Sequence, residues 1–274
     1  MTKILAENIS KTFEVKNNGK GKANGGSGLL ALSGVNLEIK KGEFLALVGP
    51  SGCGKSTFMD IVAGLTPPAE GAVYIDGKPI KGPALDRGVV FQGYALFPWR
   101  TVQSNIEFGL EIQKVPKQER KKIAKKYITL VGLTGFEDRY PHELSGGMKQ
   151  RVAIARALAY NPEVLLMDEP FGALDAQTRE MLQFELLRIT RETNKTVLFV
   201  THSIDEAVLL ADRVAIMTAR PGKIKSIIEV KISDTRFDVD SAVKSSEDFL
   251  ETRNQIWYSL KGEVAKAQTQ EYSI

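Results

Sequence analysis

Cysteine is almost absent from this chain of 274 residues, which has only Cys53. A single cysteine cannot form a disulfide within the chain, and such sparse use favours a reducing compartment. Two interpretations of Cys53 remain open: a redox-sensing thiol, or a small side chain at a permissive position. The second is favoured because nothing nearby in the sequence completes a redox pair.

Long hydrophobic runs are also missing. No segment approaches the roughly 18 apolar residues of a membrane span, and residues 1–7 lack the apolar stretch of a signal peptide. We therefore expect a soluble, cytoplasmic protein that reaches a membrane only through a partner.

A strong excess of one charge is lacking too. The net charge of +4 is too mild to indicate nucleic-acid binding, in which basic residues cluster on one face. The basic run at residues 117–126 is interpreted as the solvated face of a helix rather than as a nucleic-acid or lipid patch.

A phosphate-binding loop is what the sequence does contain. Residues 49–56 fit the pattern G-x-x-x-x-G-K-[ST], between an apolar run typical of a buried strand, 44–48, and a helical segment, 57–63. Backbone N–H groups of such a loop surround a phosphate, with Lys55 placed for the β- and γ-phosphates and Ser56 for Mg²⁺. The predicted nucleotide-binding residues here are Gly49, Pro50, Ser51, Gly52, Cys53, Gly54, Lys55, Ser56 and Thr57.

Short apolar runs continue along the chain, at residues 89–91, 164–167, 196–200 and 214–217. Apolar strands that alternate with helices indicate a parallel sheet covered on both faces. Gln92, the pair Asp168 and Glu169, and His202 each follow one of these strands. The carboxyl ends of parallel strands form the edge at which open α/β sheets bind ligands, so we expect these groups to share a site with the phosphate loop.

These polar groups suit phosphoryl chemistry. Asp168 could hold Mg²⁺ opposite Ser56, and Glu169 could activate a water for in-line attack on the γ-phosphate. Gln92 is a weaker candidate for contact with the metal or the attacking water. His202 could hydrogen-bond the γ-phosphate and sense its loss, or could be a structural histidine; its place at the sheet edge favours the first.

The remaining segments predict supporting structure. Strands are expected at 4–13, 29–39 and 73–75, with Val35, Leu37 and Ile39 on one face and a tight turn at Asp76 and Gly77. The glycine-rich residues 16–28 are expected to form a surface loop, and 93–159 to be mostly helical. The tail from about residue 226 is less patterned, apart from a helical spacing of Phe249, Ile256, Leu260 and Val264.

A second glycine-rich turn opens another predicted helix. Residues 144–148 read Leu-Ser-Gly-Gly-Met, and Ser-Gly-Gly at a helix N-terminus can bind an anion. One nucleotide does not need two such turns from one chain. This suggests two chains that face each other, each completing the other's site.

Taken in order, the phosphate loop, Gln92, the Leu-Ser-Gly-Gly turn, Asp168 with Glu169, residues 172–175 (Gly-Ala-Leu-Asp) and His202 resemble the ATP-binding cassette (ABC) transporter ATPases. The resemblance covers residues 4–224. It implies an α/β P-loop NTPase (RecA-like, mostly parallel sheet) with an antiparallel β subdomain and an inserted helical subdomain. Its expected divisions are a nucleotide-binding core with the β subdomain at 1–92 and 160–225, a helical subdomain at 93–159 and a C-terminal tail with a helix at 226–274.

The resemblance also implies an ATPase that works with Mg²⁺ as a head-to-tail dimer. Glu169, His202 and Gln92 would be catalytic, and Ser56, Gln92 and Asp168 would hold the metal. Ser145, Gly146 and Gly147 would contact the partner's ATP, and Asp175 would bridge the two sites. Phe13 would stack on adenine, with a core phenylalanine as the alternative.

Within that family, residues 96–99 (Leu-Phe-Pro-Trp) and 218–222 (Thr-Ala-Arg-Pro-Gly) are similar to the importers of nitrate, sulfonates, taurine and bicarbonate. Residues 93–100 would then dock an integral membrane permease subunit, although Phe97 and Trp99 could instead pack the helical subdomain. This implies a location at the cytoplasmic face of the cell membrane, an indirect extracytoplasmic solute-binding protein, a second ATPase subunit (the same chain or a related one) and no nucleic acid.

Two other functions remain as alternatives. A soluble ABC ATPase acting on nucleic acid or ribosomes usually has tandem cassettes or a long coiled-coil insertion, and this sequence shows neither. The other is a nucleotide-gated assembly module that does not hydrolyse ATP.

Overall fold

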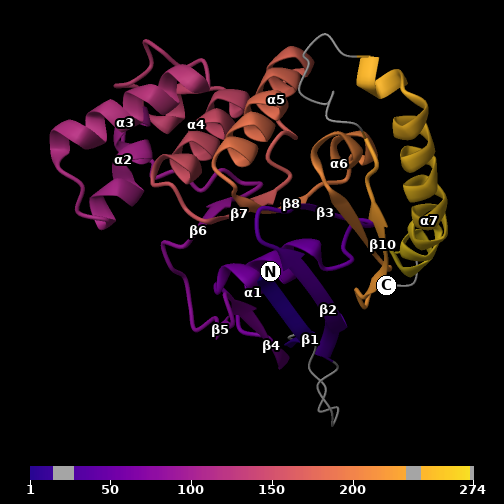
Figure 1. Ribbon diagram of the computed structural model, residues 1–274. Coiled ribbons are helices and arrows are strands. Elements are labelled where there is room, and N and C mark those ends of the chain that lie inside the picture. Colours follow the sequence, from indigo (N-terminus) through magenta and orange to yellow (C-terminus); the bar gives the residue numbers. More distant parts are fainter. Residues whose placement is uncertain (15–27, 233–241, 272–274) are drawn as a thin grey trace. The chain divides into compact units, whose positions relative to one another are not determined.

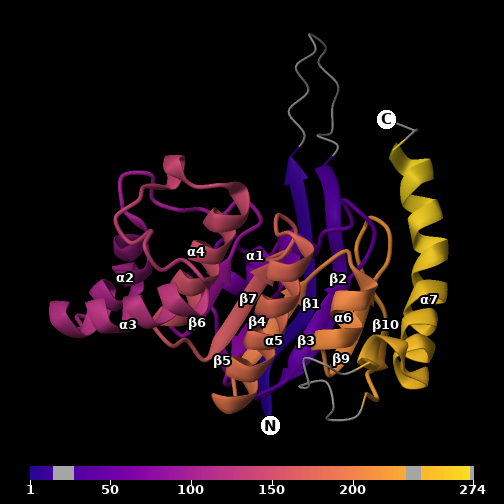
Figure 2. The same ribbon diagram turned by 90° about the horizontal axis from the view of Figure 1, so that it is seen from above.

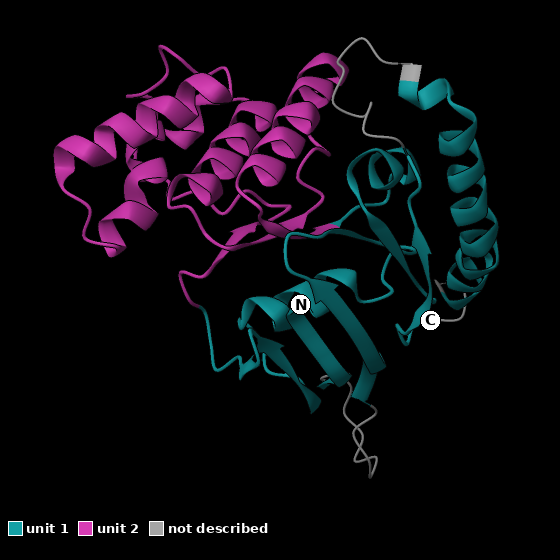
Figure 3. Cartoon of the chain, in the orientation of Figure 1, with its two compact units in different colours: residues 1–83, 200–274 teal, residues 84–199 magenta. Residues whose placement is uncertain are grey.

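The computed structural model describes residues 1–14, 28–232 and 242–271 (Figure 1). The expected glycine-rich loop at 16–28 lies outside the described residues, except for Gly28. The chain forms two compact units, residues 1–83 with 200–274 and residues 84–199 (Figure 3). The predicted helical subdomain at 93–159 falls within the second unit, together with strands expected to belong to the core. The predicted division of the chain is not the same as this one and stays a prediction.

An antiparallel sheet forms one part of the first unit. Its strands lie in the order β2-β1-β4-β5, with bounds β1 Thr2–Glu14, β2 Gly28–Lys40, β4 Glu70–Ile75 and β5 Lys78–Pro79. Val35, Leu37 and Ile39 are buried on β2 as the alternating pattern predicts. Asp76 and Gly77 both have positive φ, which is the geometry of the predicted tight hairpin turn.

The other strands of the first unit are β3 Phe44–Val48, β9 Arg213–Met217 and β10 Ile224–Glu229. β9 pairs in parallel with β3 and antiparallel with β10. All five residues of β3 are buried, which is why its sequence is an unbroken apolar run. The helices are α1 Lys55–Ala63, α6 Ile204–Leu210, the short η3 Ala242–Ser245 and α7 Glu247–Glu271.

The helix expected in the C-terminal tail is present as α7, whereas the strand β10 was not predicted. β10 is half-buried in strict alternation, and α7 is a helix of 25 residues that contacts α6 and β9 (Figure 1). Phe249, Ile256 and Leu260 are buried on α7 as predicted, whereas Val264 is 38% exposed. Half of the residues of β10 and most of those of α7 are polar, because each element covers the fold with a single face.

The second unit combines strands with most of the helices. β6 Arg87–Val90 pairs in parallel with β7 Val164–Asp168, and the strand order is β8-β7-β6, with β8 at Thr196–Val200. The helices are α2 Val102–Ile112, α3 Lys117–Leu130, η1 Pro141–Glu143, α4 Gly146–Ala159 and α5 Ala176–Glu192. α2, α3 and α4 pack on one another (Figures 1 and 2). Among the described residues, no helix has the length and apolar character needed to cross a membrane.

Candidate functional site

Residues 49–54 join the end of β3 to the start of α1. Gly52 and Gly54 have φ of 68° and 104°, in a region that side chains with a Cβ rarely adopt. Gly54 is also the residue that caps α1, and its backbone begins the helix without a side-chain hydrogen bond. The glycines of the motif are therefore required by the backbone path that turns the loop into the helix.

Neighbouring elements enclose this phosphate loop tightly. A Cβ on Gly49 would lie 2.9 Å from Cys53 Sγ and 3.1 Å from Met217 Cβ, and one on Gly222 would lie 2.1 Å from the Cys53 carbonyl oxygen. On the other side, a Cβ on Gly54 would lie 2.7 Å from a Leu32 methyl carbon. The loop backbone is thus held between β2 and the segment that follows β9, a preorganised arrangement for binding an anion.

Lys55 lies at the centre of the loop. Its side chain is buried, and its Nζ donates to the carbonyl oxygens of Gly49 and Pro50, each at 2.8 Å. Ser56 follows in the first turn of α1 and is exposed. A cation and a helix N-terminus at one point form an anion site, which is what the sequence predicts here.

Cys53 is buried at 1% exposure. Burial raises the pKa of its thiol more than the nearby Lys55 lowers it. Since the thiolate is the reactive form, the redox interpretation is not favoured and the structural one is.

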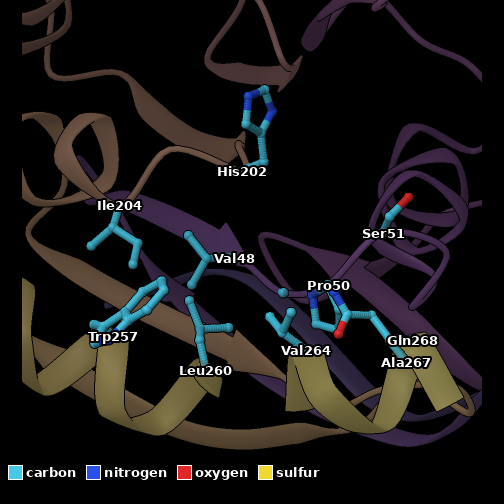
Figure 4. Close-up of a pocket in the computed structure, with 11 residues that line it drawn as sticks. Val48, Pro50, Ser51, His202, Ile204, Trp257, Leu260, Val264, Ala267 and Gln268 are labelled. Atoms are coloured by element: carbon cyan, nitrogen blue, oxygen red, sulfur yellow. The ribbon is translucent and has the colours of Figure 1, made fainter. Parts of the chain in front are cut away.

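His202 follows β8 and lines the same cavity as the beginning of the phosphate loop. The cavity has a volume of about 330 Å³, and Pro50, Ser51 and His202 lie along it (Figure 4). The structure therefore brings together two sequence features that are about 150 residues apart. This contact is the one expected of parallel strands that end at one edge of a sheet.

In the second unit, Gln92 and Glu169 are brought together. Gln92 follows β6, Asp168 ends β7, and Gln92 Nε2 donates to Glu169 Oε2 at 3.0 Å. Asp168 is buried, whereas Glu169 has φ of 46°, a conformation uncommon for a residue with a side chain. Backbone strain of this kind is concentrated at functional sites, and here it accompanies an oriented carboxylate.

The Ser-Gly-Gly turn begins α4 as predicted. Ser145 caps the helix, with its Oγ accepting from the Met148 N–H at 3.3 Å. A Cβ on Gly147 would lie 3.3 Å from the Ala173 carbonyl oxygen, so the turn is close to the segment that contains Asp175. Asp175 caps α5 by accepting from the Thr178 N–H at 2.9 Å, and hydrogen bonds from Thr178 hold its pKa below the usual value. Two helix N-termini thus lie in this part of the second unit.

Phe13 is 42% exposed near the end of β1, so the alternative of a core phenylalanine is wrong. Its ring has the ammonium of Lys11 5.6 Å from the centroid. An exposed aromatic ring beside a cation remains available for stacking on a base.

Two residues that hold the segment after Gln92 were not found from the sequence, Asn105 and Arg156. Asn105 is completely buried; its Nδ2 donates to the carbonyl oxygens of Phe97, Arg100 and Thr101, and its Oδ1 accepts from the Phe97 N–H. Arg156 on α4 donates to the carbonyl oxygens of Tyr94 and Ala95 at 3.0 and 2.6 Å. They hold residues 93–100 without contributing to any motif.

Residues 93–100 themselves are partly packed and partly open. The Phe97 ring packs on Phe108 with centroids 4.5 Å apart, as the packing alternative predicts. Trp99 is 72% exposed, as an interface residue would be. Phe97 therefore fits packing within the helical region, whereas Trp99 fits a docking surface.

The sequence model of the ABC transporter family matches residues 32–172, slightly over half of the chain. The chain belongs to the ABC transporter family. It is 55% identical, over 97% of its length and 94% of the relative, to an uncharacterized ABC transporter ATP-binding protein of Methanocaldococcus jannaschii. This ABC subunit is also similar to a solved ATP-binding cassette, a dimer in a post-hydrolysis state with bound ADP and Pi, with a TM-score of 0.74 and 35% identity over 83% of this chain and 99% of that one.

Two further relatives indicate the branch of the family. The ABC subunit is 48% identical over 94% of its length, and 38% of the relative's, to the bicarbonate transport ATP-binding protein CmpC of Synechococcus elongatus. It is 45% identical over 85% of its length, and 89% of the relative's, to the nitrate import ATP-binding protein NrtD of Synechocystis. The resemblance to this importer branch, the P-loop fold of ABC type and the ATP-hydrolysing activity are therefore confirmed.

Proposed function

We propose that this ABC subunit uses ATP hydrolysis to drive import of a small anion or organic solute of the nitrate, sulfonate, taurine or bicarbonate class. It would act at the cytoplasmic face of the cell membrane, attached to integral membrane permease subunits. An extracytoplasmic solute-binding protein would choose the cargo without touching the ATPase. The similarity to bicarbonate and nitrate transport ATP-binding proteins supports this class.

The first unit would bind the nucleotide. Backbone N–H groups of the phosphate loop and the Lys55 ammonium would surround the β- and γ-phosphates, and the exposed Phe13 ring would stack on adenine. Lys55 would exchange its two loop carbonyl contacts for phosphate oxygens, which carry more negative charge.

Mg²⁺ fits the chemistry of the proposed donor set. The Ser56 hydroxyl, the Gln92 amide oxygen and the Asp168 carboxylate are all oxygen ligands, which Mg²⁺ prefers, and nucleotide phosphates and water complete such sites. The ion would neutralise the charge on the β- and γ-phosphates.

The chemical step would depend on Glu169. Its carboxylate would accept the proton of a water that attacks the γ-phosphate in line, while the hydrogen bond from Gln92 holds the carboxylate in one orientation. His202 would hydrogen-bond the γ-phosphate and report its departure. The left-handed backbone at Glu169 further limits where the carboxylate can point.

A head-to-tail dimer would complete each site. The Ser145, Gly146 and Gly147 turn of one subunit would contact the ATP on the other subunit, and Asp175 would bridge the two sites. Dimeric cassettes among the similar structures support this arrangement. Both Ser145 and Asp175 are helix caps on the surface of the second unit, where partial positive charge and exposed N–H groups suit an anion.

The contact of Gln92 with Glu169 is the observation that carries the proposal. It joins the proposed catalytic base to the residue that immediately precedes the segment 93–100. That segment is fixed by Asn105 and Arg156 and exposes Trp99, so its movement can be passed to a docked permease.

Affinity purification from detergent-solubilised membranes tests the assignment. We expect the tagged chain to co-purify with integral membrane proteins, and the reconstituted complex to take up one of the named solutes with ATP. Glu169→Gln in the same complex should abolish uptake. Recovery of ribosomes, RNA or DNA in place of membrane proteins would contradict the importer and favour the alternative ABC ATPase.

A further inference from the structure

The buried face of α7 contains one charged residue that the proposed mechanism does not use. Phe249, Ile256 and Leu260 are buried at helical spacing, and Glu263 continues the same row at 3% exposure. A buried carboxylate is costly unless hydrogen bonds and opposite charge compensate for lost water. The partners of Glu263 therefore show which segments α7 is attached to.

Glu263 has three partners. Its Oε2 accepts from the Ala219 backbone N–H at 3.1 Å, and its Oε1 accepts from Lys225 Nζ at 3.0 Å and Lys266 Nζ at 3.2 Å. Burial raises the pKa of this carboxyl, but the hydrogen bonds from Lys225, Ala219 and Lys266 lower it by more, so that the resulting pKa is about 2. The ionised side chain thus ties α7 to the segment after β9 and to β10.

The segment that Glu263 holds is the one that packs on the phosphate loop. Gly222, three residues after Ala219, lies so close that a Cβ would be 2.1 Å from the Cys53 carbonyl oxygen. The Gly222 N–H also donates to the Ala31 carbonyl oxygen at 2.8 Å, which fixes the segment to β2. Gln270 provides a second attachment of α7, donating to the Arg220 carbonyl oxygen at 2.8 Å.

α7 also faces the phosphate loop directly. Trp257, Leu260 and Val264 form one wall of the cavity of about 330 Å³ that Pro50, Ser51 and His202 also line (Figure 4). α7 is therefore joined to the loop through the backbone after β9, and it also lines a cavity that the loop lines from another side.

We propose that Glu263 is a positioning residue of the ATPase, which holds the phosphate loop in its binding geometry through residues 219–222, with α7 as the loop's outer support. The inference rests on the proposed binding of ATP phosphates by residues 49–56. Loop N–H groups bind a phosphate only while they converge on it, so freedom in the loop weakens nucleotide binding. The chemical step would be affected much less, because the partners of Glu263 are not among the residues proposed for it.

The test is Glu263→Gln in the full chain, with steady-state ATPase kinetics. Glutamine keeps the size of the side chain but leaves Lys225 and Lys266 without their counter-charge. We expect KM for ATP to rise about threefold to tenfold, a typical size for coupling through a contact chain, with kcat close to that of the unaltered chain. Glu251→Gln, at an exposed position on the same helix, is the matched control and should keep both constants.

Two further measurements separate positioning from simple loss of structure. Gln270→Ala removes the second attachment without removing a charge, and should also raise KM even if Glu263→Gln fails to fold. The chain has two tryptophans, so in a Trp99→Phe background the emission reports on Trp257 at the cavity wall. We expect saturating ADP to shift that emission, and the Glu263→Gln chain to need a higher ADP concentration for the same shift.

Lys55→Ala distinguishes failure of the positioning role of Glu263 from failure of the proposed nucleotide site. If Lys55→Ala abolishes nucleotide binding while Glu263→Gln and Gln270→Ala keep an unaltered KM and ADP leaves Trp257 emission unchanged, the positioning role is overturned and the proposed site stands. If Lys55→Ala binds ATP normally, the proposed nucleotide site fails, and the inference fails with it.

Discussion

Two adjacent carboxylates, Asp168 and Glu169, lie at and just after the end of β7, and the structure gives them different surroundings. Asp168 is buried, whereas Glu169 has a left-handed backbone and accepts a hydrogen bond from Gln92 at 3.0 Å. This difference is what separate roles require, since a metal-holding group must stay fixed and a base must face the attacking water.

Glu169→Gln should lower kcat for ATP about a hundredfold or more, because an amide cannot accept the proton of the attacking water. Nucleotide binding should persist, since the phosphate loop is unchanged. The measurement is phosphate release together with nucleotide retention on gel filtration. Glu192→Gln, on an exposed part of α5, is the control; full turnover by Glu169→Gln would remove this residue from the role of base.

Individual site residues could be predicted from the sequence where a short motif or a neighbouring strand marks them. The glycines, Lys55 and Ser56 are fixed by a motif of eight residues, and Gln92, Glu169 and His202 by their place directly after apolar strands. Asn105, Arg156 and Glu263 could not be found in this way. Each has a backbone partner between 4 and 62 residues away, and a hydrogen bond to a backbone group puts no constraint on the type of residue that provides it.

At the scale of elements, α2 positions the segment that precedes it. Asn105→Ala would remove four hydrogen bonds to partly buried backbone groups of residues 97–101. We expect the free energy of unfolding to fall by roughly 2–4 kcal/mol, since several partly buried donors and acceptors lose their partner at once. Urea unfolding measures this, with Lys122→Ala on the exposed side of α3 as the control; equal midpoints for Asn105→Ala and the unaltered chain would contradict it.

The attachment of α7 should depend on pH. The pKa of Glu263 is about 2 in the folded chain and close to 4.5 when unfolded, so its contribution is fully present above pH 4.5 and is lost as pH falls toward 2. At pH 7 that contribution is on the order of 2–3 kcal/mol. In urea unfolding, the gap between the unaltered chain and Glu263→Gln should narrow below pH 4.5. A gap that is constant from pH 7 to 3 would exclude an ionised, stabilising Glu263.

Elements were predictable where one pattern ran without interruption. β3, β7 and β8 each have five buried residues, of which at least four are apolar, and these strands were located nearly to the residue. β10 was missed because only every second residue is partly buried. The full length of α7 was not predicted, because the helix buries a single face and a charged residue, Glu263, occupies one of the buried positions. A charged residue among the apolar residues of a helix face weakens the hydrophobic periodicity of the sequence. Glu263 can nevertheless be buried because it pairs with Lys225 and Lys266.

At the scale of the whole molecule, the chain has two kinds of helix N-terminus for which we propose a role in binding ATP. The phosphate loop ends in α1 in the first unit, and Ser145 and Asp175 cap α4 and α5 in the second. A dimer in which the Ser-Gly-Gly turn of each copy closes over the phosphate loop of the other would use both, and would make subunit association depend on ATP. Release of phosphate would then reopen the dimer and supply the movement for transport.

The structure of the Glu169→Gln chain crystallised with Mg²⁺ and ATP tests this arrangement most directly. We predict two copies enclosing two nucleotides, with the triphosphate of each on the phosphate loop of one copy and within hydrogen-bond distance of Ser145 and Gly147 of the other. Nucleotide bound to residues 49–56 with the Ser-Gly-Gly turn of every neighbouring copy remote from it would contradict the account.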